Sequence, residues 1–137
     1  MKFKTLSNRE IRMDIRPERY PIRSREQSKS HGQYMLGRLL RSIYGQALIL
    51  EEFPIPDERL VLDFYMPHHN LAFEYQGRQH DEFNKFFHAD QAGFQRSQAR
   101  DARKKVWCVL NTISLITTRD SVSVEALQKL IEEARGG

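Results

Sequence analysis

The sequence predicts one α/β domain with a mixed central sheet and helices on both faces of that sheet. Three observations support this fold class. The chain has 137 residues, which is the size of one ordinary domain. Segments with the two-residue period of strands are interspersed with segments of helical spacing, and turn residues separate them. The expected order is helix, three strands, helix, two strands and helix, which is typical of a layered α/β fold.

The first helix is expected to begin at the capping serines of Ser28–Ser30 and to end at Gly45. A short strand over Ala47–Glu51 and a turn over residues 54–57 follow, because two prolines and an aspartate mark that turn. The apolar residues that recur at helical spacing in this first helix are Tyr34, Leu36, Leu39, Leu40 and Ile43.

The middle of the chain predicts a hairpin and a long helix. Strands over Leu60–Tyr65 and Asn70–Gln76 are joined by a four-residue turn, and a polar loop with several phenylalanines follows. Residues from Ala89 to Lys105 are rich in Gln, Ala, Arg and Lys, which favours a helix there.

The last third predicts two strands and one helix. The strands are expected over Val106–Leu110 and Ile113–Thr117, separated at an asparagine. Ser121 or Ser123 is expected to cap a final helix that runs through Ala134. Together with the preceding elements, these complete the α/β order given above.

The composition is that of a folded protein without membrane contact. Hydrophobic residues make up 39% and charged residues 29% of the chain, which excludes a disordered composition. No apolar run approaches the length of a membrane span, and one cysteine excludes both an internal disulfide and a multi-cysteine zinc site. We therefore expect a cytoplasmic, intracellular protein with no structural zinc.

Positive charge is concentrated at the N-terminus. The net charge is +4, and residues 1–27 hold eight Lys/Arg against four acids, while the rest of the chain holds 14 of each. Because this segment contains Pro17 and Pro21, we expect a basic extended arm with a strand near Arg19–Arg23, ahead of a domain over residues 28–137. A basic arm favours contact with the phosphates of a nucleic acid. A solvated, fraying terminus is the alternative.

Two carboxylates are predicted to face each other in the central hairpin. Strand alternation puts Leu62 and Phe64 on one face and Asp63 on the other. If the hairpin is symmetric about residues 68–69, Asp63 lies opposite Glu74, with β-carbons roughly 4.5–5.5 Å apart. Ionised carboxylates at that distance repel each other unless a proton or cation lies between them, and Mg²⁺ relieves the repulsion. A register slip of one residue would instead leave two ordinary surface acids.

Residues near the acid pair add to the case for a metal site. Gln76 shares the face of Glu74 and can orient a water, and Gly77 lets a backbone approach a phosphodiester. Asp101 precedes Lys104 and Lys105 on one face of the expected long helix. Taken alone, that arrangement is an ordinary surface ion pair.

With these residues in place, the chain resembles the PD-(D/E)XK nuclease superfamily. More narrowly, it resembles the branch of very-short-patch-repair endonucleases, related homing endonucleases and small phage nuclease-like proteins. The resemblance covers roughly Ser28–Thr117 and rests on four motifs of that branch. In this chain they read DFYMP at 63–67, EYQGRQH at 74–80 where the branch has "EYDG-QH", "D--K---C" at 101–108 and "N-I-LI" at 111–116.

The resemblance implies a restriction-endonuclease-like fold and hydrolysis of DNA phosphodiester bonds with Mg²⁺ or Mn²⁺. Asp63 and Glu74, together with the Tyr75 carbonyl, would hold one or two ions. His80 would transfer a proton or donate to the scissile phosphate, and Asp101 would orient His80 or a metal-bound water. The catalytic set expected from motifs and neighbours is Asp63, Glu74, Gln76, His80, Asp101 and Lys104, with Lys105 as the alternative source of the positive charge.

Nucleic acid is the expected partner, with DNA favoured over RNA, and a homodimer would suit cleavage of both strands. Gln76 and Gln33 are neutral where this branch often carries acids. A nucleic-acid-binding module with weakened catalysis is therefore one alternative, and an RNA nuclease is another. The expected phosphate contacts are Arg9, Arg12, Arg16, Arg78, Lys85, Arg100 and Lys105.

Overall fold

The computed structural model describes residues 1–77 and 91–136. Its main sheet has the strand order β3–β4–β5–β6, with β3, β4 and β5 antiparallel and β6 parallel to β5. The mixed sheet that the sequence predicts is thus present. No helix among these residues is long and apolar enough to cross a membrane. The strands are β3 (Leu50–Ile55), β4 (Leu60–Met66), β5 (Leu71–Gln76) and β6 (Ser114–Arg119).

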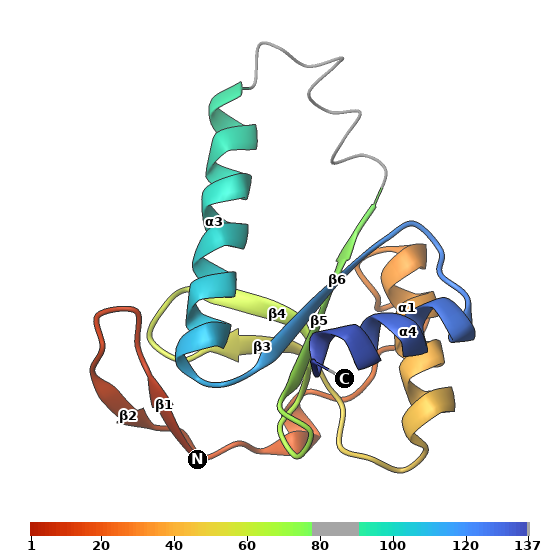
Figure 1. Cartoon of the computed structure of the whole chain (residues 1–137), viewed down its shortest axis with the longest axis horizontal. Helices are drawn as coiled ribbons and strands as arrows, with labels where there is room; N and C mark the ends of the chain where they lie inside the picture. Colours follow the sequence, from red (N-terminus) through yellow and green to blue (C-terminus); the bar gives the residue numbers. More distant parts are fainter. Residues whose placement is uncertain (78–90, 137) are drawn as a thin grey trace.

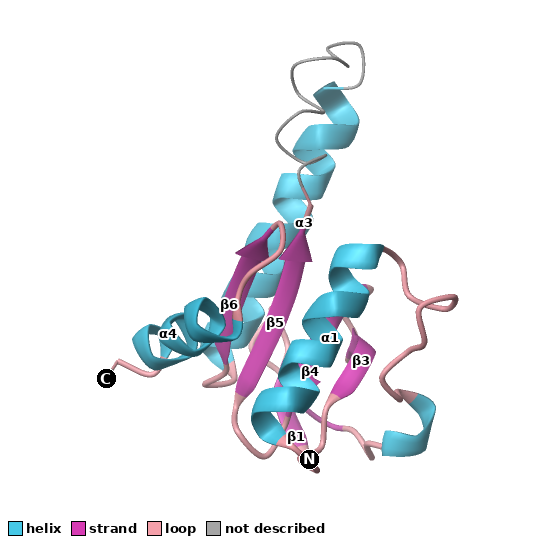
Figure 2. Cartoon of the chain, turned by 90° about the vertical axis from the view of Figure 1, so that its right-hand side faces the viewer, coloured by secondary structure: helices cyan, strands magenta, loops and turns pink. Residues whose placement is uncertain are grey.

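Helices cover both faces of this sheet, as predicted. Figure 2 shows α1 (His31–Tyr44) and α4 (Val124–Ala134) in front of the sheet and α3 (Gln91–Leu110) behind it. Two apolar clusters fill the layers between them. Phe64 and Phe73 belong to the cluster under α1 and α4, whereas the other cluster lies under α3.

Helix α1 follows the prediction closely because its caps are local. The Ser30 hydroxyl accepts a hydrogen bond from the Gln33 N–H at 3.1 Å, which satisfies a backbone donor of the first turn. Gly45 ends the helix with φ 60°, a conformation that favours glycine. Leu36 and Leu40 point into the core from one face.

Strand β3 lies later in the sequence than predicted. The expected strand Ala47–Glu51 is shifted to β3, which includes Pro54 paired with Val61 of β4. The predicted turn is present but begins later, at residues 56–59, so Pro56 and Asp57 lie in it and Pro54 does not. Because β3 is at the edge of the sheet, a residue without a backbone N–H is tolerated there. Pro54 is therefore a mark of an edge strand rather than of a turn.

The predicted strand Val106–Leu110 is wrong, because these residues form the last turns of α3. Trp107 and Cys108 are 0% and 1% exposed, whereas Val106 and Val109 are 52% and 77% exposed. Burial with this spacing follows a helical period, but a run of five apolar residues fits a strand as well. Packing of this segment against the sheet decides in favour of the helix.

The first residues form a hairpin, which differs from the expected extended arm. Strands β1 (Lys2–Lys4) and β2 (Glu10–Arg12) pair, and a short 3₁₀ helix replaces the strand predicted near Arg19–Arg23. Phe3 is 3% exposed, and its ring lies 5.4 Å from that of Trp107, centroid to centroid. This segment therefore completes the core on the α3 face of the sheet (Figure 1). The short 3₁₀ helix is η1 (Pro17–Arg19).

Candidate active site

The hairpin of β4 and β5 brings Asp63 and Glu74 together in the predicted register. Backbone pairing of the two strands ends at Phe64 and Phe73, and the acids are the next opposed residues. Beyond that point, hydrogen bonds from backbone N–H groups to the two side-chain carboxylates replace the backbone pairing of the strands. The Asp63 N–H donates to Glu74 Oε2 at 2.6 Å, and the Tyr75 N–H donates to Asp63 Oδ2 at 2.8 Å. Each carboxylate is thus held by a backbone donor of the opposite strand.

Side-chain alternation breaks at Asp63, which the sequence did not predict. Leu62 packs with Tyr65 in the cluster under α3, whereas Phe64 packs in the other cluster. The expectation that Leu62 and Phe64 share a face was therefore wrong. The neighbouring strand is also irregular at this level, since Glu52 has φ 54° and is left out of the pairing between β3 and β4.

The acid pair is buried at an electrostatic cost. Asp63 and Glu74 are each 7% exposed. Burial, together with the nearby charge of Glu74, raises the pKa of Asp63 to about 7, against the opposing effects of the Tyr75 N–H and two lysines. Burial also raises the pKa of Glu74, which Lys104 opposes. A buried pair of this kind is typical of a site that takes up a cation or a proton.

Two lysines from opposite layers neutralise the acids. Lys104 of α3 places its Nζ 2.6 Å from Glu74 Oε1, and its side chain is 15% exposed. Lys29, which precedes α1, places its Nζ 3.2 Å from Glu52 Oε1 and 3.9 Å from Asp63 Oδ1. The structure therefore selects Lys104 over Lys105 as the positive charge beside the glutamate.

Lys29 and Glu52 are site residues that sequence reasoning missed. Glu52 lies next to Asp63 only because β3 pairs with β4 in the observed register. Its backbone has a positive φ, which no residue pattern in the sequence announces. The available signal was the second of two consecutive acids inside an edge strand, and this signal is weak.

Gln33 has a structural role that explains its neutral side chain. It is 3% exposed, and its Nε2 donates to Glu51 Oε2 at 2.9 Å and to Glu52 Oε2 at 3.0 Å. Glu51 also accepts a hydrogen bond from the Arg23 N–H at 2.6 Å. A carboxylate at position 33 would face two further carboxylates without a donor, so the amide suits this place.

Tyr75 is held in place by a close approach to α1. A Cβ added at Gly32 would lie 1.9 Å from the Tyr75 Cζ, so the ring occupies the space that glycine leaves open. The backbone of the same tyrosine donates to Asp63. The first turn of α1 therefore supports the strand end that carries the acid pair.

We expect Gly32→Ala to destabilise the fold by about 1–3 kcal/mol, because the new methyl group displaces the Tyr75 ring. Alanine itself favours a helix by roughly 0.5–1 kcal/mol, so the loss comes from the clash. The test is chemical denaturation of a double-mutant cycle with Tyr75→Ala. In the Tyr75→Ala background the Gly32→Ala substitution should become neutral or stabilising. An equal cost in both backgrounds would contradict the assigned contact.

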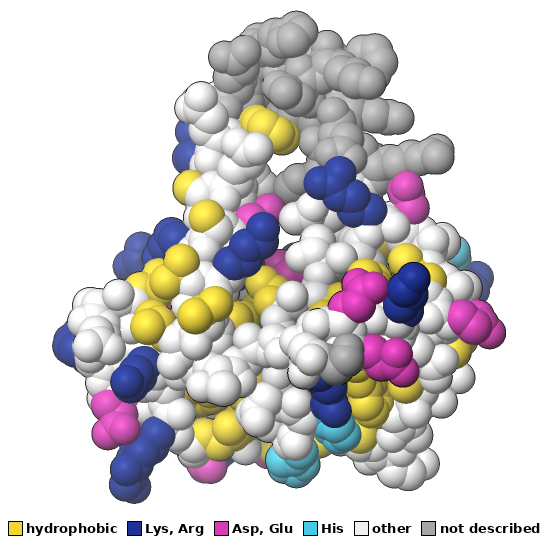
Figure 3. All heavy atoms as spheres, in the orientation of Figure 1, with side chains coloured by type: hydrophobic (Ala, Val, Ile, Leu, Met, Phe, Trp, Pro, Cys, Tyr) yellow, Lys and Arg dark blue, Asp and Glu magenta, His cyan; other side chains and the backbone are white. Residues whose placement is uncertain are grey.

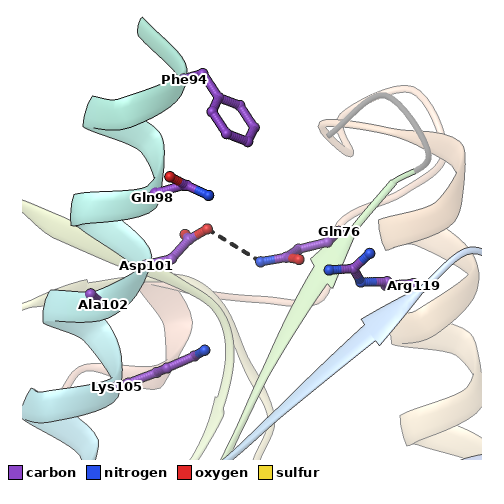
Figure 4. A pocket seen from close by; sticks show the side chains of 7 residues that line it. All are labelled: Gln76, Phe94, Gln98, Asp101, Ala102, Lys105 and Arg119. Atoms are coloured by element: carbon purple, nitrogen blue, oxygen red, sulfur yellow. Dashed lines mark hydrogen bonds between the residues drawn. The ribbon is translucent and has the colours of Figure 1, made fainter. Parts of the chain in front are cut away.

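Beside the acid pair, a groove separates α3 from the ends of β5 and β6 (Figure 4). Its volume is about 300 Å³. Gln76 reaches across it, and its Nε2 donates to Asp101 Oδ2 at 3.2 Å. Two residues predicted for catalysis are thus brought together next to Glu74. The groove is lined by Gln76, Phe94, Gln98, Asp101, Ala102, Lys105 and Arg119.

Of the predicted basic residues in the described part of the chain, Lys105 lines the groove, whereas the others are dispersed. Arg9 lies in the N-terminal hairpin region and pairs with Asp57 at 3.2 Å, far along the chain from the groove residues. Arg12 and Arg16 belong to the same N-terminal region, and Arg100 is exposed on α3. On the face drawn in Figure 3, Lys and Arg side chains lie along α3 and over the N-terminal hairpin. Three predicted site residues lie outside the described part of the chain: Arg78, His80 and Lys85.

The donor set fits a hard divalent cation. In the described ranges 1–77 and 91–136, no three acidic, histidine or cysteine side chains are grouped as a metal site. Mg²⁺, however, is held in many proteins by one or two carboxylates together with waters and substrate oxygens. The buried pair Asp63 and Glu74, with raised pKa values, supplies that number of carboxylates.

Comparison with known proteins finds similarity to two viral proteins over part of the chain. The chain is 38% identical over 63 residues to uncharacterized protein 033L of Invertebrate iridescent virus 3, which is 46% of this chain and 32% of that protein. It is 39% identical over 57 residues to uncharacterized protein 307L of Invertebrate iridescent virus 6, covering 42% of this chain and 29% of that protein. No family model matches the chain, and no solved structure matches it. The chain thus spans about a third of the length of the curated relatives it matches.

Proposed function

We propose that this chain is a metal-dependent DNA endonuclease with a restriction-endonuclease-like fold. One observation carries the proposal: Asp63 and Glu74 are opposed at the end of a hairpin, and burial raises the pKa of each. A fold has no structural need to bury two acids side by side, because their mutual repulsion opposes folding. Sites that bind and release a cation have such a need.

Each residue near the pair has a role in this proposal. Asp63 and Glu74 would hold Mg²⁺ or Mn²⁺, with the Tyr75 carbonyl as a third donor. The bound ion would supply an activated water and neutralise charge on the phosphate. Lys104 already contacts Glu74 and would place a positive charge beside the scissile phosphate. Asp101 and Gln76, joined by a hydrogen bond, would orient a water at the edge of the groove.

A nucleic acid is favoured as the substrate by the distribution of charge, and the resemblance to DNA endonucleases favours DNA over RNA. Helix α3 carries five basic residues and one acid, and it borders the groove next to the acid pair. Basic residues along such an element attract the phosphate backbone of a nucleic acid without regard to sequence. Those basic residues are Arg96, Arg100, Arg103, Lys104 and Lys105.

A nucleic-acid-binding module with weakened catalysis is the second candidate. It is favoured by Gln76, a neutral residue whose amide is engaged with Asp101 instead of adding charge at the pair. It is also favoured by the lysines that already neutralise both acids. In this candidate the basic surface would bind DNA and no phosphodiester bond would be cut.

The deciding experiment is a panel of DNA and RNA substrates incubated with Mg²⁺, Mn²⁺ or EDTA and read on denaturing gels. Under the leading proposal, DNA is cut with either metal and remains intact with EDTA. In parallel, Mn²⁺ should raise the melting temperature of the wild type and leave that of Glu74→Gln unchanged, because ligands that bind the native state stabilise it. Binding of DNA without cleavage and without a metal-dependent melting shift would favour the module. Cleavage of RNA alone would assign the site to an RNA nuclease.

A further inference from the structure

We propose that the groove between α3 and the ends of β5 and β6 binds a single unpaired nucleotide beside the acid pair. This inference deepens the proposed nuclease function and rests on it. It assigns a substrate class, namely a nucleic acid with an unpaired or displaced nucleotide rather than an uninterrupted duplex. Four features of the groove support it: its position next to Glu74, its aromatic wall, its polar groups and its size.

The groove adjoins Glu74, one member of the acid pair. A small cavity next to it is lined by Glu74 and Lys104 and shares Gln76, Asp101 and Lys105 with the groove. A group bound in the groove therefore lies next to the carboxylate that would hold the metal. In a nucleic acid, the neighbour of a bound nucleotide is the phosphodiester that joins it to the next one. A nucleotide that fills the groove would therefore carry its phosphodiester toward Glu74.

The walls of the groove offer the groups that recognise a nucleotide. Figure 4 shows Phe94, Gln98 and Asp101 projecting from α3 toward the groove, opposite Gln76. An aromatic ring provides a stacking surface for any base. The Gln98 amide has both a donor and an acceptor for a base edge, and the carboxylate of Asp101 accepts from an exocyclic amine.

Positive charge lies at the border of the same groove. Lys105 and Arg119 line it from α3 and from the end of β6, respectively. A phosphate attached to a stacked nucleotide would lie between these two elements and be attracted by both cations. Together with Phe94, this arrangement has the stacking surface and the basic lining of known single-strand binding sites.

The volume selects one nucleotide rather than a duplex. At about 300 Å³ the groove is at the lower end of the range for small-molecule pockets, which is roughly 300–1,000 Å³. A base pair stacked in a helix does not enter such a space, so a base must leave the stack to reach Phe94. A mismatched, bulged or single-stranded base leaves the stack at the lowest cost.

The test measures binding without catalysis, in EDTA, with the full chain. Two DNA duplexes are compared that contain the same 2-aminopurine nucleotide. In one duplex the opposite strand supplies a thymine that pairs with it, and in the other this thymine is missing, so the 2-aminopurine is bulged. We expect the bulged duplex to bind about tenfold more tightly, with a change in 2-aminopurine fluorescence when the base moves onto the phenylalanine. Phe94→Leu should remove this preference, and Phe94→Tyr should retain it, because only the latter keeps an aromatic face.

Matched controls separate a local effect from a loss of structure. Val109 is 77% exposed at the other end of α3, so Val109→Ala should bind both duplexes as the wild type does. Circular dichroism checks the helix content of each variant. If Phe94→Leu does not fold, Gln98→Ala, an exposed substitution in the same groove, takes its place and should weaken the preference several-fold.

The outcomes separate this inference from the nuclease proposal. Loss of the bulge preference in Phe94→Leu, with no cleavage under any metal, would uphold the groove assignment and refute the nuclease. The opposite result is cleavage together with no preference of the wild type for the bulged duplex, or with a preference that Phe94→Leu leaves unchanged. That result would overturn the groove assignment and support the nuclease proposal. Repeating the measurement with the same bulge in RNA decides whether the nucleotide comes from DNA or RNA.

Discussion

Asp63→Asn is expected to abolish cleavage and at the same time stabilise the folded chain. An asparagine keeps an oxygen that can accept from the Tyr75 N–H, so the local structure survives. It removes one of two carboxylates at the proposed metal site, and the loss of charge stabilisation should lower the rate by about 10³ or more. It also removes the repulsion with Glu74 and the cost of burying a charge, which should raise the free energy of unfolding by about 1–3 kcal/mol near neutral pH.

The pH dependence of the free energy of unfolding is an independent test of the acid pair Asp63 and Glu74. Asp63 has a pKa of about 7 in the folded chain and an ordinary value of 3.8. The folded state therefore binds the proton more tightly, and stability falls as pH rises from 3.8 to about 7 and levels off at higher pH. Denaturation of Asp63→Asn across this range should lack that decline.

The matched control for Asp63→Asn is Asp57→Asn, because Asp57 is an exposed acid in an ion pair with Arg9. We expect this variant to keep both the cleavage rate and the pH dependence of the wild type. An Asp63→Asn variant that cleaves at the rate of the wild type would remove the central support of the nuclease proposal. If the stability of Asp63→Asn declined with pH as steeply as that of the wild type, this would show that Asp63 is not buried beside a second acid.

Lys104→Met is expected to have the largest effect on stability. The Lys104 ammonium lies 2.6 Å from Glu74, and the side chain of Glu74 is 9% exposed. Methionine keeps most of the side-chain volume but leaves a carboxylate buried without its cation. Removing one partner of a buried pair costs about 3–5 kcal/mol. We expect a loss of that size near pH 8, measured by urea denaturation, together with loss of cleavage.

The loss from Lys104→Met should shrink at lower pH. Burial already raises the pKa of Glu74, and removal of the lysine raises it further, so the acid protonates at a higher pH than in the wild type. Lys129→Met, an exposed substitution on α4, is the matched control and should stay within about 0.5 kcal/mol of the wild type. A loss that is the same at both pH values would mean that Lys104 acts by packing rather than by charge.

The site carries more acid than its two lysines neutralise. Glu51 and Glu52 lie on the strand next to Asp63, and Gln33 contributes only a neutral amide to them. A locally negative centre thus exists inside a protein whose net charge is +4. This combination suits a nuclease, because the basic exterior attracts the phosphate backbone and the acidic centre attracts the metal.

Local chemistry explains why the sequence predicted the hairpin and the first helix so well. The register that places Asp63 opposite Glu74 depends on a short turn and on alternation in the residues next to it. The limits of α1 depend on Ser30 and Gly45, which act on the first and last turns directly. The break in alternation at Asp63 was missed because it depends on β3, a strand whose own limits were predicted too early.

By itself the sequence determined the α/β class, the first helix and the pairing of the two acids, since each depends on residues close together in the chain. The tertiary structure alone decided that residues 106–110 are helical, that Lys104 rather than Lys105 reaches Glu74, and that Lys29 and Glu52 join the site. It also placed Phe3 in the core beside Trp107, more than a hundred residues away. The reason is physical: periodicity and capping act over a few residues, whereas burial and ion pairing depend on which distant segments meet.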